Sequence, residues 1–119
     1  MEREEVKAFC QAFSNEWAHI FDIPKTTRIR LKVRAMKARG FYFNEFDDDG
    51  EYHVIALNPE MHLTKEEVYG TMAHELIHCE QRVKRIGVDH SEKFWLRVSE
   101  VANIMGFDCI LIADKELDK

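Results

Sequence analysis

The feature that most constrains this 119-residue chain is the motif H-E-x-x-H at residues 74–78. It lies within a segment from about Thr64 to Arg85 in which apolar residues recur at helical spacing. Residues four positions apart share one face of a helix, so the imidazoles of His74 and His78 can point toward one metal ion. Imidazole is a preferred ligand of zinc, and a catalytic zinc site uses three protein ligands and keeps one position open to water. The sequence therefore predicts a helix that carries two of three zinc ligands.

Both ends of this segment carry helix-boundary signals. Thr64 and Glu67 form a T-x-x-E capping box, in which the two side chains satisfy backbone N–H groups of the first turn. Gly87 lies beyond the other end and can adopt the left-handed conformation that ends many helices. The last turn also holds three cations, which favour the negative end of the helix dipole: Arg82, Lys84 and Arg85. The histidine pair is therefore expected in the middle of a helix.

A third ligand is expected at His90, directly after this helix. Asp89 and Glu92 form a second capping box, D-x-x-E, which places His90 in the first turn of a helix over about 89–105. A sharp reversal between the two helices would return its imidazole to the other two. Glu75 follows the first histidine by one residue, which places its carboxylate beside the metal as a candidate general base. The remaining histidines are expected in surface or core roles: His19, His53 and His62.

At these residues the chain resembles a known family. The stretch H-E-L-I-H at 74–78, followed by H-S-E-K-F at 90–94, is similar to the SprT-like zinc metallopeptidase domain. The resemblance covers most of the chain, with Ser91 where the family usually has glycine. It implies an α+β, minimal zincin-like metalloprotease domain in which His74, His78 and His90 hold Zn²⁺ and Glu75 is the catalytic base.

The chemistry expected at this site is zinc-assisted hydrolysis of peptide bonds in protein substrates. Zinc held by three neutral imidazoles lowers the pKa of a bound water toward about 7, and Glu75 accepts the proton. The substrate is expected to lie extended along a sheet edge, and the strand from Glu51 to Leu57 is the candidate edge. Tyr42 and Tyr52 are candidates for steadying the oxyanion. The family resemblance extends the expected substrates to DNA-associated proteins.

Two other classes of function stay open at the level of sequence. A non-catalytic binding module with a structural zinc could use the same ligands, although such a site needs no base and usually closes with a fourth Cys or His. A metal-dependent ribonuclease with three histidine ligands is less favoured, because its third ligand follows after a shorter gap and its motif lacks the glutamate. The retention of Glu75 makes a zinc metalloendopeptidase the preferred prediction.

The remaining elements are expected to form one domain over 1–119, with an N-terminal helix and a small, antiparallel-rich sheet. The helix is predicted over about 4–21, with an apolar stripe buried against the sheet. Strict alternation over 28–35 predicts a half-buried strand, with Ile29, Leu31 and Val33 facing inward.

A hairpin is predicted next, between strands at 40–46 and 51–57, because the acidic run at 47–50 ends in glycine and suits a turn. The helix that follows the third ligand is expected to stop at Gly106. The apolar stretch 107–113 is expected either to add a last strand or to pack as an arm.

The composition predicts a cytoplasmic monomer without membrane contact. The formal net charge is −5, no apolar run reaches membrane-spanning length, and neither a signal peptide nor an anchor is visible. Cys10, Cys79 and Cys109 are odd in number and widely spaced, so they are predicted to be reduced core thiols.

The positive charge is concentrated in one segment. Seven of the seventeen basic residues lie between Lys25 and Arg39, where there is no acid. Four of them face outward on the predicted strand: Arg28, Arg30, Lys32 and Arg34. The favoured interpretation is a solvated strand whose cations discourage edge pairing, and the alternative is a weak, salt-sensitive contact with nucleic acid.

Overall fold

The computed structural model describes residues 1–113, which form an α+β fold with a small mixed sheet. Its extents are 35 × 31 × 27 Å, and the described part contains no helix long and apolar enough to cross a membrane. In chain order the elements are α1 (Arg3–Trp17), η1 (Ala18–Ile20), β1 (Ile29–Val33), β2 (Gly40–Asp47), β3 (Gly50–Leu57), η2 (Pro59–Met61), α2 (Lys65–Lys84), α3 (Glu92–Met105) and η3 (Cys109–Leu111).

The sheet has the strand order β1-β3-β2, which makes β3 its central strand. The predicted hairpin is confirmed, because β2 pairs antiparallel with β3 and Asp47 is registered with Gly50 across the turn. The strand β1 takes the other side of β3 and runs parallel to it, with Leu31 opposite Ile55. The expectation of a sheet edge at residues 51–57 is therefore wrong, since sequence order does not fix strand order. The sheet is mixed, with one antiparallel and one parallel pairing.

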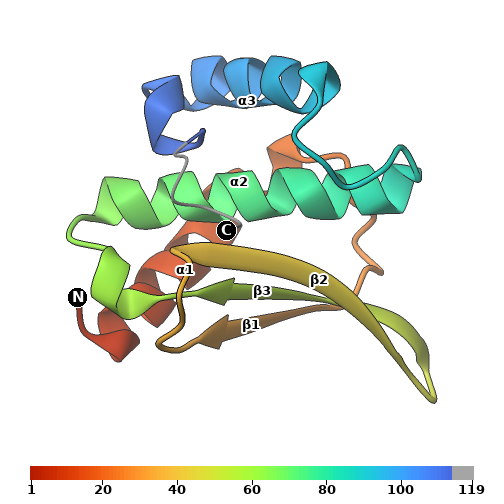
Figure 1. Ribbon diagram of the computed structural model, residues 1–119, viewed down its shortest axis with the longest axis horizontal. Helices are drawn as coiled ribbons and strands as arrows, with labels where there is room; N and C mark the ends of the chain where they lie inside the picture. Colours follow the sequence, from red (N-terminus) through yellow and green to blue (C-terminus); the bar gives the residue numbers. More distant parts are fainter. Residues whose placement is uncertain (114–119) are drawn as a thin grey trace.

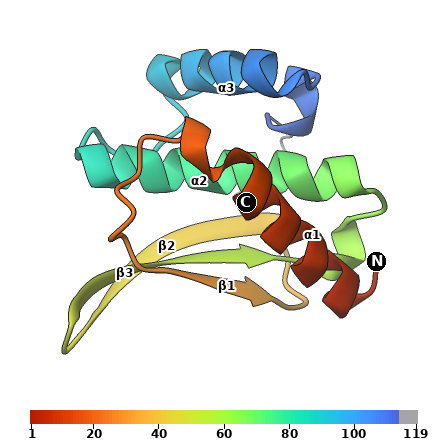
Figure 2. The ribbon, with the colours of Figure 1, turned by 180° about the vertical axis from the view of Figure 1, so that it is seen from behind.

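All three helices lie on one face of the sheet (Figures 1 and 2). The helix α2 crosses that face, and α3 covers α2 on the side away from the strands. The helix α1 packs mainly on α2, as in the edge contact of Phe13 with Tyr69 at 5.1 Å between ring centroids. The apolar stripe of α1 was expected to pack against the sheet. That prediction is wrong, because the stripe packs mainly against α2. Because α2 has neighbours on all sides, every residue from Val68 to Gln81 is buried.

The capping box at the start of α2 is confirmed. The backbone N–H of Glu67 donates to Thr64 Oγ1 at 3.1 Å, and the backbone N–H of Thr64 donates to the Glu67 carboxylate at 3.0 Å. At the other end Arg85 takes the left-handed conformation, with φ 58°, whereas Gly87 was expected to do so. Gly87 also has a positive φ, but it lies in the loop beyond the cap.

The helix α3 begins later than predicted. Its N-cap is Ser91, and the Asp89 carboxylate accepts the backbone N–H of Ser91 at 3.1 Å in a local turn. His90 therefore precedes the helix, whereas the sequence placed it in the first turn. The far end agrees with expectation, because Gly106 adopts a left-handed φ of 71° and ends the helix.

The stretch 107–113 packs as an arm against α2 and does not add a strand. It contains the short η3 turn, and Ile112 at its end is fully buried. Cys109 is exposed, so the prediction of a core thiol is wrong there and holds for Cys10 and Cys79. On β1, Ile29 and Leu31 are 40% and 39% exposed, because this strand lies at the edge of the sheet.

Candidate metal centre

The three predicted ligand histidines come together in space. His74 and His78 project from consecutive turns of α2, and His90 returns from the loop before α3. The Nε2 atom of His90 lies 3.2 Å from Nε2 of His78 and 3.3 Å from Nε2 of His74. The ligand atoms of all three residues lie within 4.8 Å of one another, close enough to bind one metal ion.

These separations suit a tetrahedral metal. Zinc–imidazole bonds of about 2.0–2.1 Å at tetrahedral angles place ligand nitrogens about 3.3–3.4 Å apart. The two Nε2–Nε2 distances to His90, 3.2 and 3.3 Å, match that spacing. Three imidazoles form a donor set that suits zinc and also copper, iron and nickel. The residues therefore fit a first-row transition metal.

Hydrogen bonds at Nδ1 fix the tautomers of the two helical ligands. Nδ1 of His74 lies 2.7 Å from the carbonyl oxygen of Ile112, which can only accept, so Nδ1 carries the proton. Nδ1 of His78 lies 2.8 Å from Oε1 of Gln81, whose amide nitrogen donates to the Asp89 carbonyl at 3.2 Å. Both Nε2 atoms then present lone pairs to the cluster. Ligating histidines in metalloproteins are commonly oriented in this way.

Phe94 packs against all three imidazoles. Its ring centroid lies 5.0 Å from that of His74, 4.7 Å from that of His78 and 4.8 Å from that of His90, and Phe94 is fully buried. Trp95 stacks on His90 at 5.8 Å. The sequence analysis did not predict the contact of these two α3 residues with the ligands. The rings restrict imidazole motion and exclude water from one side of the cluster.

Glu75 is completely buried on α2. At 3.6 residues per turn it lies about 60° around the helix axis from His78 and about 100° from His74. Its carboxylate therefore belongs to a face adjacent to the histidine cluster.

The cluster has an open side. His74 and His78 are buried, whereas His90 is exposed. A pocket of about 190 Å³ adjoins it between β2 and the loop after α2, and its lining residues are Phe41, Tyr42, His78, Val88, Asp89 and His90. A substrate group can therefore approach the ligands from the side of β2.

Each of the two candidate oxyanion tyrosines contacts another side chain of the fold. Tyr42 lines the pocket, but its hydroxyl lies 2.6 Å from Nδ1 of His53. Burial raises the pKa of Tyr42 and lowers the pKa of His53, so both are neutral near pH 7 and the hydroxyl donates. Tyr52 lies under the guanidinium of Arg30, which is 4.0 Å from its ring centroid. These contacts do not select between the two tyrosines, and an oxyanion role for either stays a prediction.

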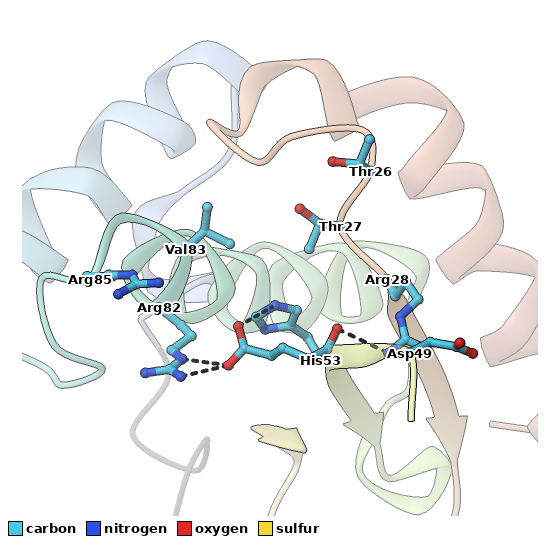
Figure 3. Close-up of a pocket in the computed structure, with 9 residues that line it drawn as sticks. Thr26, Thr27, Arg28, Asp49, His53, Arg82, Val83 and Arg85 are labelled. Atoms are coloured by element: carbon cyan, nitrogen blue, oxygen red, sulfur yellow. Dashed lines mark hydrogen bonds and ion pairs between the residues drawn. The ribbon is translucent and has the colours of Figure 1, made fainter. Parts of the chain in front are cut away.

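A separate cavity of about 400 Å³ lies where the end of α2 meets the start of β3, and His53 is one of the residues that line it (Figure 3). Arg82 donates two hydrogen bonds, of 2.7 and 3.0 Å, to one oxygen of Glu51, and this contact lowers the pKa of the Glu51 carboxyl. Arg28 pairs with Asp47 at 2.7 Å. These ion pairs connect α2 and the start of β1 to the hairpin. The charged residues that line the cavity therefore stabilise the fold.

The four cations on and directly beside β1 are partly neutralised within the fold. Both Arg28 and Arg30 pair with Asp47 of the hairpin, whereas Lys32 and Arg34 are exposed. His62 was expected in a surface or core role, and it is a buried core residue whose ring bonds the Asn58 carbonyl and the Thr71 hydroxyl at 2.6 and 2.8 Å.

Comparison with known proteins adds no assignment. No protein-family model matches the chain, and the search of curated proteins finds no match. The family resemblance of the histidine motifs therefore stays a prediction, and the function must be argued from the site.

Proposed function

We propose that this protein is a zinc-dependent endopeptidase. One observation carries the proposal: three histidines come together at metal-ligand spacing, and a buried glutamate directly follows the first of them in the sequence. This arrangement supplies the three protein ligands, the open position and the base that peptide hydrolysis by zinc enzymes requires. The same residues carry the resemblance to SprT-like metallopeptidases.

His74, His78 and His90 would hold the ion through Nε2. When bound, zinc supplies Lewis acidity and makes a water molecule acidic near neutral pH. Glu75 accepts a proton from the attacking water and returns it to the leaving amine. The hydrogen bonds at Nδ1 of His74 and His78 keep their imidazoles in the ligating tautomer throughout.

The substrate path follows β2. This strand is an edge of the sheet and carries Tyr42, which lines the pocket beside the histidines. Its outer edge can pair with an extended peptide through main-chain hydrogen bonds. Phe41, which is 43% exposed at the pocket, offers an apolar contact for a substrate side chain.

The test is the variant Glu75→Gln, assayed on a loosely folded protein with stoichiometric zinc. The amide is nearly isosteric with the carboxylate but accepts no proton, so we expect unchanged zinc stoichiometry and a rate lower by about a hundred- to ten-thousand-fold. Glu66→Gln is the matched control, because Glu66 is exposed on the first turn of the same helix.

Two results would contradict the proposal. Cleavage by Glu75→Gln at the wild-type rate would show that Glu75 is not the general base. Zinc binding without cleavage by the wild-type protein, with or without DNA, would favour the alternative of a binding module with a structural zinc.

A further inference from the structure

The backbone of the arm after α3 contacts the metal centre. The carbonyl oxygen of Ile112 accepts the proton of His74 Nδ1 at 2.7 Å, across 38 positions of sequence. Both groups are buried, so this bond is shielded from water. A residue of the arm thereby orients the first metal ligand.

Gly70 allows this arm to dock. It lies one helical turn before His74, and a Cβ built there would collide with the carbonyl oxygen of Leu111 and come within 2.7 Å of its carbonyl carbon. Backbone atoms cannot move aside without displacing the arm. Glycine at this position therefore permits the close approach of η3 to α2.

The arm is a folded unit and not a loose tail. The Asp108 side chain caps its turn by accepting the Ile110 N–H at 3.0 Å. The N–H groups of Ile112 and Ala113 both donate to the Cys109 carbonyl, at 3.0 and 2.9 Å. The buried side chain of Ile112 anchors this turn in the core. The position of the Ile112 carbonyl is thus set by docking of the whole turn.

We propose that the arm, residues 107–113, is a positioning element of the metal centre, so that docking of the arm and metal binding stabilise each other. The proposal rests on the metal site of the proposed function but not on peptidase activity. His74 binds metal best with its Nδ1 proton held by the Ile112 carbonyl. Coupling between two sites is reciprocal, so a bound metal must hold the arm in place to the same extent.

Gly70→Ala tests the first half of this coupling. Alanine favours the helix intrinsically, but its Cβ displaces the arm, so we expect zinc affinity to fall by about ten- to a hundredfold. The readout is competition with a zinc chelator. Gly50→Ala is the matched control, because the φ of 112° at Gly50 in the hairpin strains any residue with a Cβ, although a Cβ there meets nothing within 4 Å. We expect that control to lose stability and keep its zinc affinity.

Ile112→Ala keeps the proposal testable if Gly70→Ala does not fold. It retains the backbone carbonyl and every ligand but removes the anchor, so a smaller loss of zinc affinity is expected. Nitrogen-15 NMR of His74 should show the Nδ1–H tautomer in the wild type and a mixture of tautomers in both arm variants.

Hydrogen exchange tests the second half on the unmodified protein. Zinc should slow exchange of the Ile112 and Ala113 amides relative to the metal-free protein. Equal zinc affinity in Gly70→Ala and the wild type, or equal exchange with and without zinc, would overturn the coupling. Affinity and exchange are measured without substrate, so they separate this proposal from failure of the peptidase proposal.

Discussion

Each candidate ligand is oriented by a different kind of neighbour. His74 donates to a backbone carbonyl, His78 donates to a side-chain amide, and His90 lies against Trp95 and Phe94. The first two histidines are rigid parts of a buried helix, whereas His90 lies in an exposed loop. His90 is therefore the ligand whose removal disturbs the fold least.

For this reason His90→Ala is expected to keep the fold and lose stoichiometric metal. Loss of a hydrogen bond to a metal ligand typically lowers metal affinity by about ten- to a hundredfold. Loss of the ligand His90 itself should lower zinc affinity by more than that. Metal analysis after dialysis, with circular dichroism to verify the fold, gives the answer. His19→Ala serves as control, since His19 is exposed on η1. Unchanged stoichiometry in His90→Ala would exclude His90 from the site.

At the level of elements, the hairpin holds β1 in the sheet through Asp47. Its carboxylate accepts two hydrogen bonds from Arg28, of 2.7 and 3.0 Å, and one of 3.3 Å from Arg30. The bonds from Arg28 are the main reason that the pKa of Asp47 falls to about 2 from an ordinary 3.8. A carboxyl whose pKa is lower in the folded state stabilises that state above its unfolded pKa.

Asp47→Asn should therefore destabilise the protein in a pH-dependent manner. The difference in Tm between the wild type and the variant is expected to be full above about pH 4. It should shrink as the pH falls through the folded pKa of about 2, where the wild-type carboxyl is protonated. Thermal melts across this range measure it, with Asp48→Asn, exposed in the same turn, as control. A difference in Tm that does not vary with pH would show that Asp47 acts through uncharged contacts.

Local signals made α2 predictable. The capping box of Thr64 and Glu67 and the i, i+4 histidines depend on neighbouring residues alone, and both were placed correctly. Gln81 could also have been found, since a residue three positions after His78 shares its helical face. The sequence carries no comparable signal for the Ile112 carbonyl, because every residue has one and only tertiary packing selects this one.

The other two errors concern the partner of β1 and the start of α3. The alternation in β1 indicated a strand but could not indicate its partner, so the parallel pairing with β3 was missed. His90 was assigned to a helix because Asp89 and Glu92 match a capping box, whereas Asp89 bonds the Ser91 N–H instead. The prediction of His90 as a metal ligand does not depend on this assignment, because the loop before α3 also brings His90 to His74 and His78.

On the scale of the whole molecule, the acidic net charge of −5 opposes binding to nucleic acid. Of the four cations on and directly beside β1, Asp47 pairs with Arg28 and Arg30, which leaves Lys32 and Arg34. Two phosphate contacts give a slope of about −2 for the logarithm of affinity against the logarithm of salt concentration. The surface is therefore suited to weak contacts at low salt.

We accordingly expect weak binding to single- and double-stranded DNA, with about a tenfold loss between 50 and 200 mM salt. Fluorescence anisotropy at several salt concentrations measures the slope. The double variant Lys32→Ala with Arg34→Ala should remove most of the salt dependence. Submicromolar affinity at physiological salt would show that further cations take part.

The uneven burial of the cysteines makes the arm accessible to chemical labelling. Burial raises the pKa of the Cys10 and Cys79 thiols to about 12, so almost no thiolate forms on either at neutral pH. Cys109 is exposed on η3, in the turn that ends at the Ile112 carbonyl. A maleimide dye added to the folded wild-type protein will therefore attach at Cys109 without any engineered substitution, and its emission will follow undocking of the arm.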